Sequence, residues 1–278
     1  MRAARDLNCA CTVVVPTSAK PFMIAKLHAA GAADVIQHGA SWFEADSFLR
    51  AQYIDPGPGS GPEAQETVNV YIPPFDNLRV WEGASSMIDE IAAQMPAGGD
   101  AGTGFPAEAI VCSVGGGGLF NGVVMGLEKH AGASSSSKDV RVLAVETEGA
   151  HSLAHSLRLG RLDSLSAITS QATSLGALCV AEKAFLNARS PPAGVQVSSI
   201  VSSDAEAARG IVLLADETRL QVELACGVSV EVAVGGRLKE VVPDLNPESR
   251  VVVVVCGGSN ITAEMIAEYR RQLDDGWK

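Results

Sequence analysis

The sequence has little positive charge and no long apolar run. Asp and Glu number 32 against 21 Lys and Arg, which gives a formal net charge of −11. A nucleic-acid interface needs a basic surface that neutralises phosphates, so this composition argues against a nucleic-acid partner. The longest strongly apolar run, Val251–Cys256, has six residues, whereas a membrane-spanning helix needs about 20. No apolar segment follows Met1–Asp6 to form a secretion signal, so we predict a cytoplasmic protein without membrane contact.

The cysteines form no Cys-x-x-Cys pair, the spacing that marks many metal and redox sites. Most of them lie within apolar stretches, which is typical of buried structural thiols. The six cysteines are Cys9, Cys11, Cys112, Cys179, Cys226 and Cys256. We predict that they are reduced and mostly buried, as in a cytosolic protein.

Apolar residues make up 47% of the chain, which is enough for a sizeable core. Their pattern alternates between helix and strand, which predicts an α/β fold on a mainly parallel sheet. The expected strands are 11–15, 34–37, 68–72, 109–114, 140–146, 197–201 and 251–255, the last a central buried strand. The expected helices are 17–30, 41–52, 78–95, 119–130, 152–159, 176–189, 203–218, 221–242 and 262–273. A short helix at 2–7 has no strand before it, so the pattern begins in mid-unit and predicts a truncated chain.

Four consecutive glycines, Gly115, Gly116, Gly117 and Gly118, separate a predicted strand from a predicted helix. Without Cβ atoms, the backbone N–H groups of such a loop can surround a phosphate at the helix N-terminus. The loop has no Lys-Ser/Thr of a Walker A motif and no G-x-G-x-x-G spacing. We predict phosphate binding; the alternative is a tight strand-to-helix turn, although one glycine would serve for that.

A second strand end carries Glu146, followed by the segment 147–152 with carbonyls and a hydroxyl. Such oxygen ligands could hold a cation. The alternative is a helix N-cap with Glu in the first turn of that helix, with no ligand. His151 and His155 are four residues apart, but no glutamate completes a zinc motif, so zinc is not expected.

A third strand end is Cys256-Gly257-Gly258-Ser259-Asn260, where two glycines allow a ligand to approach the backbone. In an open α/β sheet, ligands bind outside the carboxyl ends of the strands. Cys256 therefore shares an edge with the glycine loop. The alternative is a buried apolar cysteine before a turn.

These motifs together resemble the pyridoxal-phosphate-dependent serine dehydratase (L-serine ammonia-lyase, L-threonine deaminase) family of the tryptophan-synthase-β-like fold, also called fold type II. The resemblance implies two open parallel-sheet domains, both incomplete at the N-terminus: residues 1–77 as the remainder of a small domain and residues 78–278 as the large cofactor-binding domain. The motifs that carry it are 71–76 (YIPPFD), 81–83 (WEG), 113–119, 146–152, 168–170, 222–227 (VELACG) and 255–260.

The resemblance implies a role for each strand end. The glycine loop would hold the cofactor phosphate, Cys256 and Gly257 would face the pyridine nitrogen, and Ser174 would lie against one face of the ring. The closest mammalian-type pattern has Ala at the position of Ser174, and Leu224 stands where the family usually has Pro. The resemblance also implies a site for a monovalent cation such as K⁺. Its ligands would be Glu146, the Ser152 hydroxyl and the carbonyls of Gly115, Ala150, Leu175 and Ala177.

The resemblance also implies an absence. The family's Schiff-base lysine and its substrate-carboxylate loop lie upstream of the segment that begins near Arg2, and neither is present, so no catalytic residue is assigned and we expect no turnover. The expected family reaction is β-elimination of L-serine or L-threonine, which gives pyruvate or 2-oxobutanoate and ammonia. The resemblance places this reaction in serine catabolism that feeds gluconeogenesis, and it implies a homodimer.

One alternative is a lysine-less pseudoenzyme that binds the cofactor or a partner protomer. Another is a β-replacement, which Cys256 disfavours. The seven lysines are Lys20, Lys26, Lys129, Lys138, Lys183, Lys239 and Lys278.

Overall fold

The computed structural model describes residues 2–55, 68–95, 105–131 and 139–277. The chain forms two compact units, Met1–Ile72 (unit 1) and Pro73–Lys278 (unit 2), and each is described by itself. In both units, helices alternate with strands that pair in parallel. This confirms the predicted α/β class. Among the described residues, no helix is both long and apolar enough to span a bilayer.

Unit 1 is built around two parallel strands that pair along their whole length. The buried apolar residues in its described part are Ala32 and Ala45, so its core is small. The N-cap of α3 is Ser41, whose hydroxyl accepts the N–H of Glu44. The elements are α1 (Arg2–Asp6), β1 (Thr12–Val15), α2 (Pro21–Ala29), β2 (Asp34–Gln37), α3 (Trp42–Leu49) and the π-helix η1 (Arg50–Ile54).

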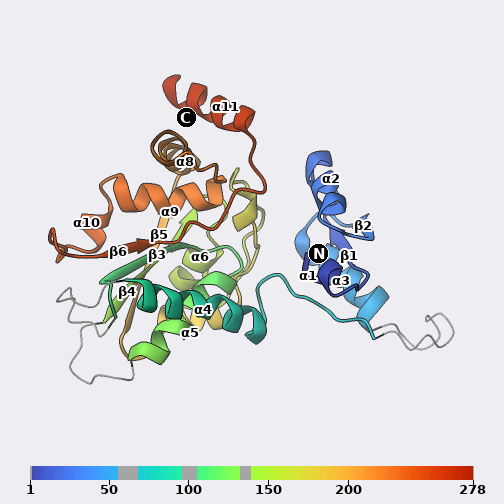
Figure 1. Ribbon diagram of the computed structural model, residues 1–278, viewed down its shortest axis with the longest axis horizontal. Coiled ribbons are helices and arrows are strands. Elements are labelled where there is room, and N and C mark those ends of the chain that lie inside the picture. Colours follow the sequence, from blue (N-terminus) through green and yellow to red (C-terminus); the bar gives the residue numbers. More distant parts are fainter. Residues whose placement is uncertain (1, 56–67, 96–104, 132–138, 278) are drawn as a thin grey trace. The chain divides into compact units, whose positions relative to one another are not determined.

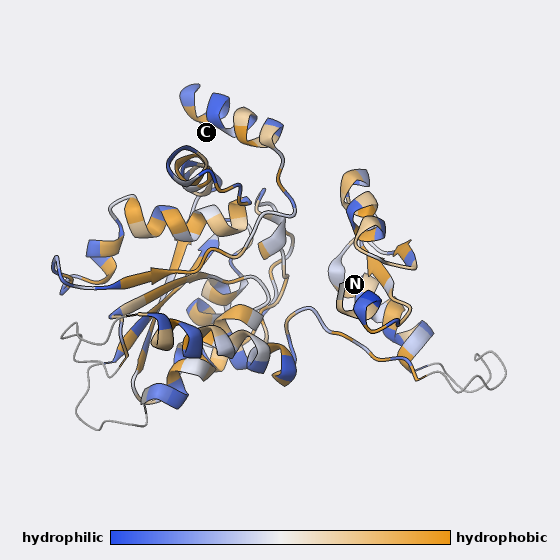
Figure 2. Cartoon of the chain, viewed as in Figure 1, coloured by the Kyte–Doolittle hydropathy of each residue, from blue (hydrophilic) through white to orange (hydrophobic). Residues whose placement is uncertain are grey.

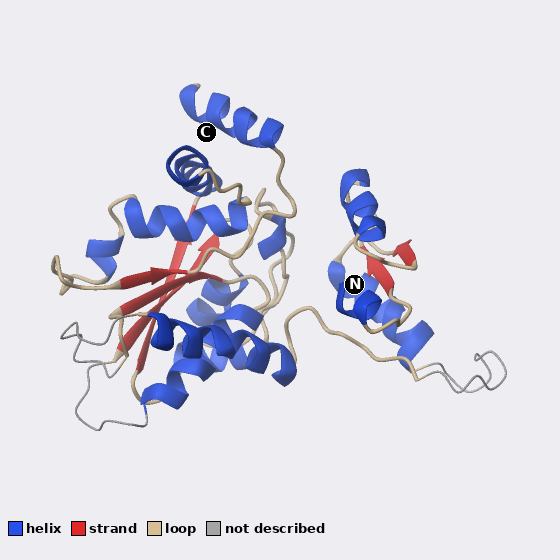
Figure 3. Cartoon of the chain, in the orientation of Figure 1, coloured by secondary structure: helices blue, strands red, loops and turns tan. Residues whose placement is uncertain are grey.

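Unit 2 contains a four-stranded parallel sheet in the order β5-β4-β3-β6. Helices α9 and α10 cover one face, and α4 and α5 cover the other (Figure 1; Figure 3). The strands are β3 (Ala109–Ser113), β4 (Val140–Thr147), β5 (Val195–Ser202) and β6 (Val251–Val253). The helices are α4 (Leu78–Gln94), α5 (Gly118–Ala131), α6 (Ser152–Leu159), the 3-10 helix η2 (Thr173–Leu175), α7 (Glu182–Arg189), α8 (Asp204–Thr218), α9 (Leu224–Val234), α10 (Leu238–Val241) and α11 (Ala263–Asp274).

The sheet of unit 2 is buried on both faces, which explains its continuous apolar runs. In β3, Ala109 and Val111 join the core on the α9 side, while Ile110 and Cys112 join the core on the α5 side. Helix α9 is apolar around its whole circumference and is buried from Leu224 to Val232, as Figure 2 shows in orange. A helix of this kind belongs to the interior of a protein.

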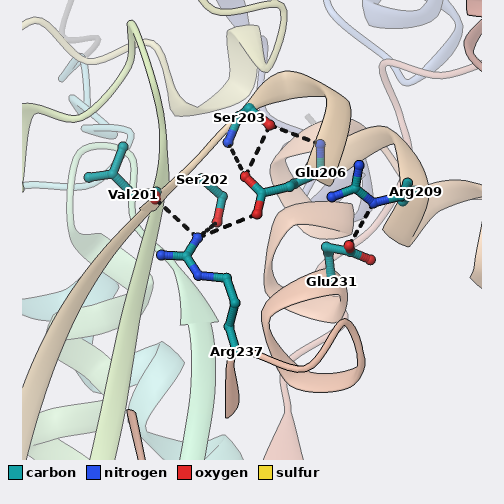
Figure 4. Close-up of polar contacts among 7 residues, drawn as sticks. All are labelled: Val201, Ser202, Ser203, Glu206, Arg209, Glu231 and Arg237. Atoms are coloured by element: carbon teal, nitrogen blue, oxygen red, sulfur yellow. Dashed lines mark hydrogen bonds and ion pairs between the residues drawn. The ribbon is translucent and has the colours of Figure 1, made fainter. Parts of the chain in front are cut away.

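A polar network joins the end of β5 to the start of α8 (Figure 4). Ser203 and Glu206 form a capping box at the N-terminus of α8. Arg237, just before α10, donates to Ser202 Oγ at 2.6 Å and to the Val201 carbonyl at 3.2 Å. It also pairs with Glu206 Oε1 at 3.6 Å, so one guanidinium fixes three groups.

A second ion pair in Figure 4 links α8 to the apolar helix α9. Arg209 Nε donates to Glu231 Oε1 at 2.7 Å. Close approach of the two helices is made possible by Gly210 and Gly227: a Cβ at Gly210 would lie 2.0 Å from the Gly227 carbonyl oxygen. Glu231 is therefore a nearly buried charge whose partner comes from the adjacent helix.

The predicted strand at 68–72 is wrong, because this segment is extended without a ladder partner in the described residues. Side chains hold it instead. Asn69 Nδ2 donates to the Tyr53 carbonyl at 2.9 Å, and the Tyr71 hydroxyl donates to Asp46 Oδ1. Arg50 pairs with Asp46 at 2.8 Å and lies 4.2 Å from the centre of the Tyr71 ring. The alternating apolar pattern here reflects this attachment to unit 1.

Three further predictions need correction. The helix expected at 221–242 is broken by Gly235 and Gly236, the latter at φ +101°, a conformation that favours glycine. The helix expected at 176–189 begins only at Glu182. The strand expected at 251–255 spans Val251–Val253, lies at the edge of the described sheet and is half-buried, so it is not central.

The cysteines are free, but their predicted burial is wrong for Cys9 and Cys256, which are exposed. Cys112 and Cys226 are buried as predicted. Cys256 is exposed because β6 ends at Val253, three residues earlier, and the chain leaves the sheet there.

Candidate active site

The carboxyl ends of β3, β4 and β6 meet at one edge of the sheet of unit 2, since the three strands are parallel neighbours. The Val114 N–H donates to the Val145 carbonyl at 2.8 Å, which joins the ends of β3 and β4. Ser113 Oγ and Cys256 Sγ lie 3.9 Å apart, which joins the ends of β3 and β6. The three strand ends singled out in the sequence are thus brought together.

The glycine loop is packed so closely that side chains are excluded from it. A Cβ at Gly116 would lie 2.2 Å from Phe75 Cγ, and one at Gly118 would lie 3.0 Å from Phe75 Cα. Gly117 has φ +95°, and its Cβ would lie 2.6 Å from Ala184 Cβ. Phe75 is itself held in place, because Trp81 Nε1 donates to its carbonyl at 2.8 Å.

The amide groups of this loop donate no hydrogen bond within the described part of the chain: none has the N–H of Gly115, Gly116, Gly117 or Gly118 as donor. The loop leads into α5, whose N-terminal end carries partial positive charge. Free amides at a helix N-terminus form an anion site. The cradle thus fits a phosphate group, and the expected tight turn alone does not account for its unbonded amides.

Glu146, at the end of β4, is completely buried. Its two carboxylate oxygens accept the N–H groups of Leu153 and Ala154, each at 2.8 Å, so the side chain satisfies the start of α6. Burial raises the pKa of Glu146 to about 7, although these two N–H donors oppose the shift. Glu146 therefore caps α6 from the end of β4, and not from the first turn of the helix, where the alternative placed a glutamate.

The other residues expected around a cation lie near these strand ends. Ser152 Oγ is buried and has no hydrogen-bond partner in the described structure. The Leu175 carbonyl accepts the Ala177 N–H at 2.7 Å, and a Cβ at Gly115 would lie 3.0 Å from Leu175 Cα. The described residues contain no cluster of three or more His, Cys, Asp or Glu side chains that could hold a metal ion.

The two histidines after β4, His151 and His155, each have a hydrogen-bond partner within the protein. His151 Nδ1 accepts the Gly149 N–H at 3.1 Å, and His155 Nδ1 lies 3.1 Å from an Arg158 guanidinium nitrogen. Burial lowers the pKa of His151, with the Arg158 charge as a further cause. These contacts hold both imidazole rings in place beside the start of α6.

Cys256 lies over the start of α9. The Glu223 N–H donates to the Gly257 carbonyl at 3.2 Å, and Cys256 Sγ lies 3.9 Å from Ser113 Oγ and from the Val254 carbonyl oxygen. The neighbouring Cys226 thiol, followed by burial, raises the pKa of Cys256. Cys256 therefore presents a neutral thiol at this edge.

Ser174 is exposed on η2, and its hydroxyl donates to Glu223 Oε2 at 3.0 Å. Asn260 Nδ2 donates to Thr173 Oγ1 at 2.9 Å. The loop after Ser170 is also attached to the start of α8, because Ser170 Oγ donates to Asp204 Oδ1 at 2.6 Å. These bonds place Ser174 between the glycine loop and the start of α9.

Two residues of this site had no role in the sequence analysis. Phe75 belongs to the motif 71–76, but nothing in the sequence indicates that its ring covers the glycine loop. Glu223 directly precedes α9, a signal for a helix start, yet its bond to Ser174 depends on a fold that brings separate segments together.

The described lysines lie on helices or, for Lys20, at a helix N-cap. Lys20 and Lys26 belong to unit 1, and Lys129, Lys183 and Lys239 lie on helices of unit 2. All five are exposed. Lys129 Nζ donates to Ser85 Oγ at 3.1 Å. Lys138 and Lys278 lie outside the described residues.

Comparison with known proteins relates this chain to one enzyme family. The family model of pyridoxal-phosphate dependent enzymes matches residues 2–257. An L-serine dehydratase of Saccharomyces cerevisiae (strain AWRI1631) is 36% identical over 94% of this chain and 73% of its own length. A catabolic L-serine/threonine dehydratase of S. cerevisiae (strain ATCC 204508 / S288c) is 34% identical over 96% of this chain and 70% of its own.

Solved structures agree with this relationship. A fungal L-serine ammonia-lyase from Rhizomucor miehei superimposes with a TM-score of 0.79 at 29% identity, over 97% of this chain and 76% of that one. The processed form of threonine deaminase isoform 2 from Solanum lycopersicum has the same fold, with a TM-score of 0.74. The fold is that of fold type II pyridoxal-phosphate enzymes, and the chain belongs to the pyridoxal-phosphate dependent enzymes of the L-serine dehydratase family, which are lyases.

Proposed function

We propose that unit 2 binds pyridoxal 5'-phosphate with its phosphate on the amides of Gly115 to Gly118. The observation that carries this proposal is the set of unbonded N–H groups at the N-terminus of α5. A phosphate there would accept these N–H groups and gain from the helix dipole. The side chains around the glycines leave no room for larger residues, so the backbone is the only part of the loop that faces a ligand.

The cofactor ring would extend from the glycine loop toward Cys256 and Gly257. The distance of 3.9 Å between Ser113 Oγ and Cys256 Sγ supports this direction, because it places the thiol beside the strand that leads into the loop. Ser174 would lie against one ring face. A neutral thiol beside a pyridine nitrogen does not hold a proton on that nitrogen as a carboxylate would, which favours β-elimination over transamination.

The substrate class follows from the relatives. We propose that the site is built for the ammonia-lyase reaction of L-serine and L-threonine, which gives pyruvate or 2-oxobutanoate and ammonia. Bound pyridoxal phosphate supplies an electron sink for loss of the substrate's Cα proton and β-hydroxyl. The residues of this chain would bind and orient the cofactor, with phosphate at one end and the Cys256 thiol at the other.

A lysine is the group that this chemistry needs, and none of the described lysines is buried. All five described lysines are exposed on helices or, for Lys20, at a helix N-cap. We therefore propose that this chain binds the cofactor without covalent attachment and without turnover. This observation favours the second candidate function, a cofactor-binding protein that does not catalyse.

We further propose that K⁺ binds beside Glu146. The supporting observation is Ser152 Oγ, a buried hydroxyl without a partner in the described residues. Its ligands would be Glu146, Ser152 and the carbonyls of Gly115, Ala150, Leu175 and Ala177. We expect KCl to raise the unfolding temperature more than tetramethylammonium chloride at equal ionic strength, and Ser152→Ala to remove the difference. An equal effect of both salts would contradict the site.

We propose that units 1 and 2 correspond to the small and large domains expected at 1–77 and 78–278. We also propose a cytoplasmic homodimer that acts in serine catabolism. Light scattering of the purified chain at several concentrations measures the oligomeric state directly, and a monomer throughout would contradict the dimer.

The central experiment adds pyridoxal phosphate to the full chain and follows its near-ultraviolet and visible absorbance, with dialysis, borohydride treatment and a pyruvate assay on L-serine. We expect a cofactor spectrum that dialysis removes, no borohydride-trapped adduct and no pyruvate. A trapped adduct with pyruvate release would show that one of the lysines is in place and would overturn the non-catalytic proposal. No cofactor binding would overturn the site itself.

A matched pair of variants ties binding to the glycine loop. Gly116→Ala would place a methyl group in the Phe75 ring, whereas a Cβ at Gly83, on the exposed side of α4, would have no neighbour within 4 Å. We expect Gly116→Ala to lose cofactor binding and Gly83→Ala to retain it. Equal affinities would contradict the placement of the phosphate.

A further inference from the structure

The segment 170–177, called here the Ser174 loop, reaches the proposed cofactor site from the side opposite Cys256 in the sequence. It carries Ser174, and it also carries Leu175, whose Cα lies 3.0 Å from the position of a Cβ at Gly115. Apart from the short helix η2, the loop has no regular secondary structure. The position of Ser174 therefore depends on the hydrogen bonds that attach this loop to the rest of unit 2.

The buried hydroxyl of Ser170 attaches the first residue of the Ser174 loop. Its Oγ accepts the Ala172 N–H at 3.0 Å, lies 2.8 Å from Thr147 Oγ1 and donates to Asp204 Oδ1 at 2.6 Å. A hydroxyl has one proton and two lone pairs. Because the proton of Ser170 is directed to the Asp204 carboxylate, the Thr147 hydroxyl is the donor to Ser170. All the hydrogen-bonding capacity of Ser170 Oγ is thus used, and Asp204 sets its direction.

Asp204 also holds the loop through its backbone. The second carboxylate oxygen, Oδ2, accepts the Gln171 N–H at 2.8 Å. Asp204 is the first residue of α8, but the capping box of this helix is formed by Ser203 and Glu206 (Figure 4). The start of α8 is therefore capped without Asp204, and both oxygens of the Asp204 carboxylate bind the Ser174 loop.

The residues that Asp204 holds are the ones on which the turns around Ser174 are built. The Thr173 N–H donates to the Gln171 carbonyl at 2.9 Å, and the Leu175 N–H donates to the Ala172 carbonyl at 2.8 Å. Ser174 lies between these two donors in the chain. A displacement of residues 170–172 would therefore move Ser174 and Leu175 with them.

We propose that Asp204 is a positioning residue of the cofactor site, which sets the place of Ser174 against the cofactor ring. Asp204 acts through the Ser174 loop, by holding Ser170 and Gln171, and is not itself a ligand of the cofactor. This inference rests on the proposed function, because it takes the ring to lie at Ser174. It adds a residue that lies outside the three strand-end motifs and whose role depends on a carboxylate with two acceptor oxygens.

The test compares Asp204→Asn with the unaltered full chain in pyridoxal phosphate binding. An amide has one acceptor oxygen, so it cannot accept both the Ser170 O–H and the Gln171 N–H as the carboxylate does. We expect the cofactor to bind about 10- to 100-fold more weakly, as when groups that orient metal ligands are changed. We also expect a smaller induced circular dichroism per bound cofactor, because the ring is held less firmly. Equal affinity and equal circular dichroism would overturn the proposal.

Two further variants separate positioning from stability. Ser170→Ala keeps Asp204 but removes the hydroxyl that it directs, so we expect the same loss of circular dichroism. Glu206→Gln weakens the capping box of the same helix without contact to the Ser174 loop. It should lower the unfolding temperature and leave the circular dichroism of the bound cofactor unchanged. If Glu206→Gln reduces that signal as much as Asp204→Asn, the positioning role is wrong. If Asp204→Asn fails to fold, Ser170→Ala decides the question.

Hydrogen–deuterium exchange without cofactor supplies an independent measurement. We expect the amides of Gln171, Thr173 and Leu175 to exchange faster in Asp204→Asn than in the unaltered chain, and no such change in Glu206→Gln. Equal exchange in the unaltered chain and Asp204→Asn would show that Asp204 does not hold the loop. If the unaltered chain binds no pyridoxal phosphate, both the cofactor site and the role of Asp204 toward it are wrong. If the unaltered chain and Asp204→Asn bind it alike, only the role of Asp204 is wrong.

Discussion

The ring of Phe75 occupies the place that a side chain at Gly116 would need, with Phe75 Cγ 2.2 Å from the position of that Cβ. The glycine requirement of the loop thus has two origins. One is the packing of Phe75 on the loop, and the other is the free backbone on its opposite side. The two can be separated by mutation.

We predict that Gly116→Ala destabilises the protein by about 1–3 kcal/mol, the usual cost of overpacking. Phe75→Ala in the same chain should recover part of this loss, because the space for the added methyl group is then open. Urea unfolding of the two single variants and the double variant measures the interaction. Strictly additive changes in the free energy of unfolding would contradict the packing explanation.

We predict that Glu146→Ala lowers the free energy of unfolding by about 3–5 kcal/mol. The change leaves the N–H groups of Leu153 and Ala154 without acceptors in a buried region and opens a cavity. Glu148→Ala is the control, since Glu148 is exposed two residues along and its loss should cost less than about 0.5 kcal/mol. Equal effects in urea unfolding would rule out a structural role for Glu146.

We predict that Arg209→Ala costs about 1–3 kcal/mol, because it leaves Glu231 nearly buried on an apolar helix without its partner. Arg271→Ala removes an exposed pair with Glu268 on α11 and should cost less than about 0.5 kcal/mol. Thermal unfolding of the two variants compares them. A larger effect at Arg271 would mean that Glu231 is satisfied by other means.

We predict that the Cys226 thiol titrates with a pKa of about 7. The groups that face it are the Cys256 thiol, the Glu223 carboxylate and, next to Cys256, the Cys112 thiol. Ultraviolet absorbance of the thiolate should rise through neutral pH in the unaltered chain and not in Cys226→Ala. The same rise in both proteins would assign the charge to another cysteine.

The same titration predicts how stability depends on pH. The folded pKa of Cys226 is lower than the ordinary value of 9.0, so between about pH 7 and 9 the unfolded chain holds a proton that the folded chain has lost. The free energy of unfolding should therefore rise with pH in this window, relative to Cys226→Ala, by at most about 1.4 kcal/mol per pH unit. A flat difference between the two proteins would contradict the lowered pKa.

The sequence was sufficient for the sheet of unit 2 and for the loops at its edge. The apolar runs of β3 and β4 and the glycines after β3 are local signals, and the rule for parallel strands brings their ends together. The strand predicted at 68–72 failed because the alternation of Val68, Val70 and Ile72 does not reveal whether a neighbouring strand exists. The bond between the Glu223 N–H and the Gly257 carbonyl was also beyond the sequence, since it depends on how the segment after β6 approaches the start of α9.

The two units are joined by a short covalent connection with an anchor on each side. Tyr71 is bonded to Asp46 of unit 1, and Phe75 packs on the glycine loop of unit 2. Between them lie only Ile72 and two prolines, whose fixed φ angles make the segment stiff. Because the indole of Trp81 is bonded to the Phe75 carbonyl, its fluorescence would report any change in how Phe75 packs on the glycine loop.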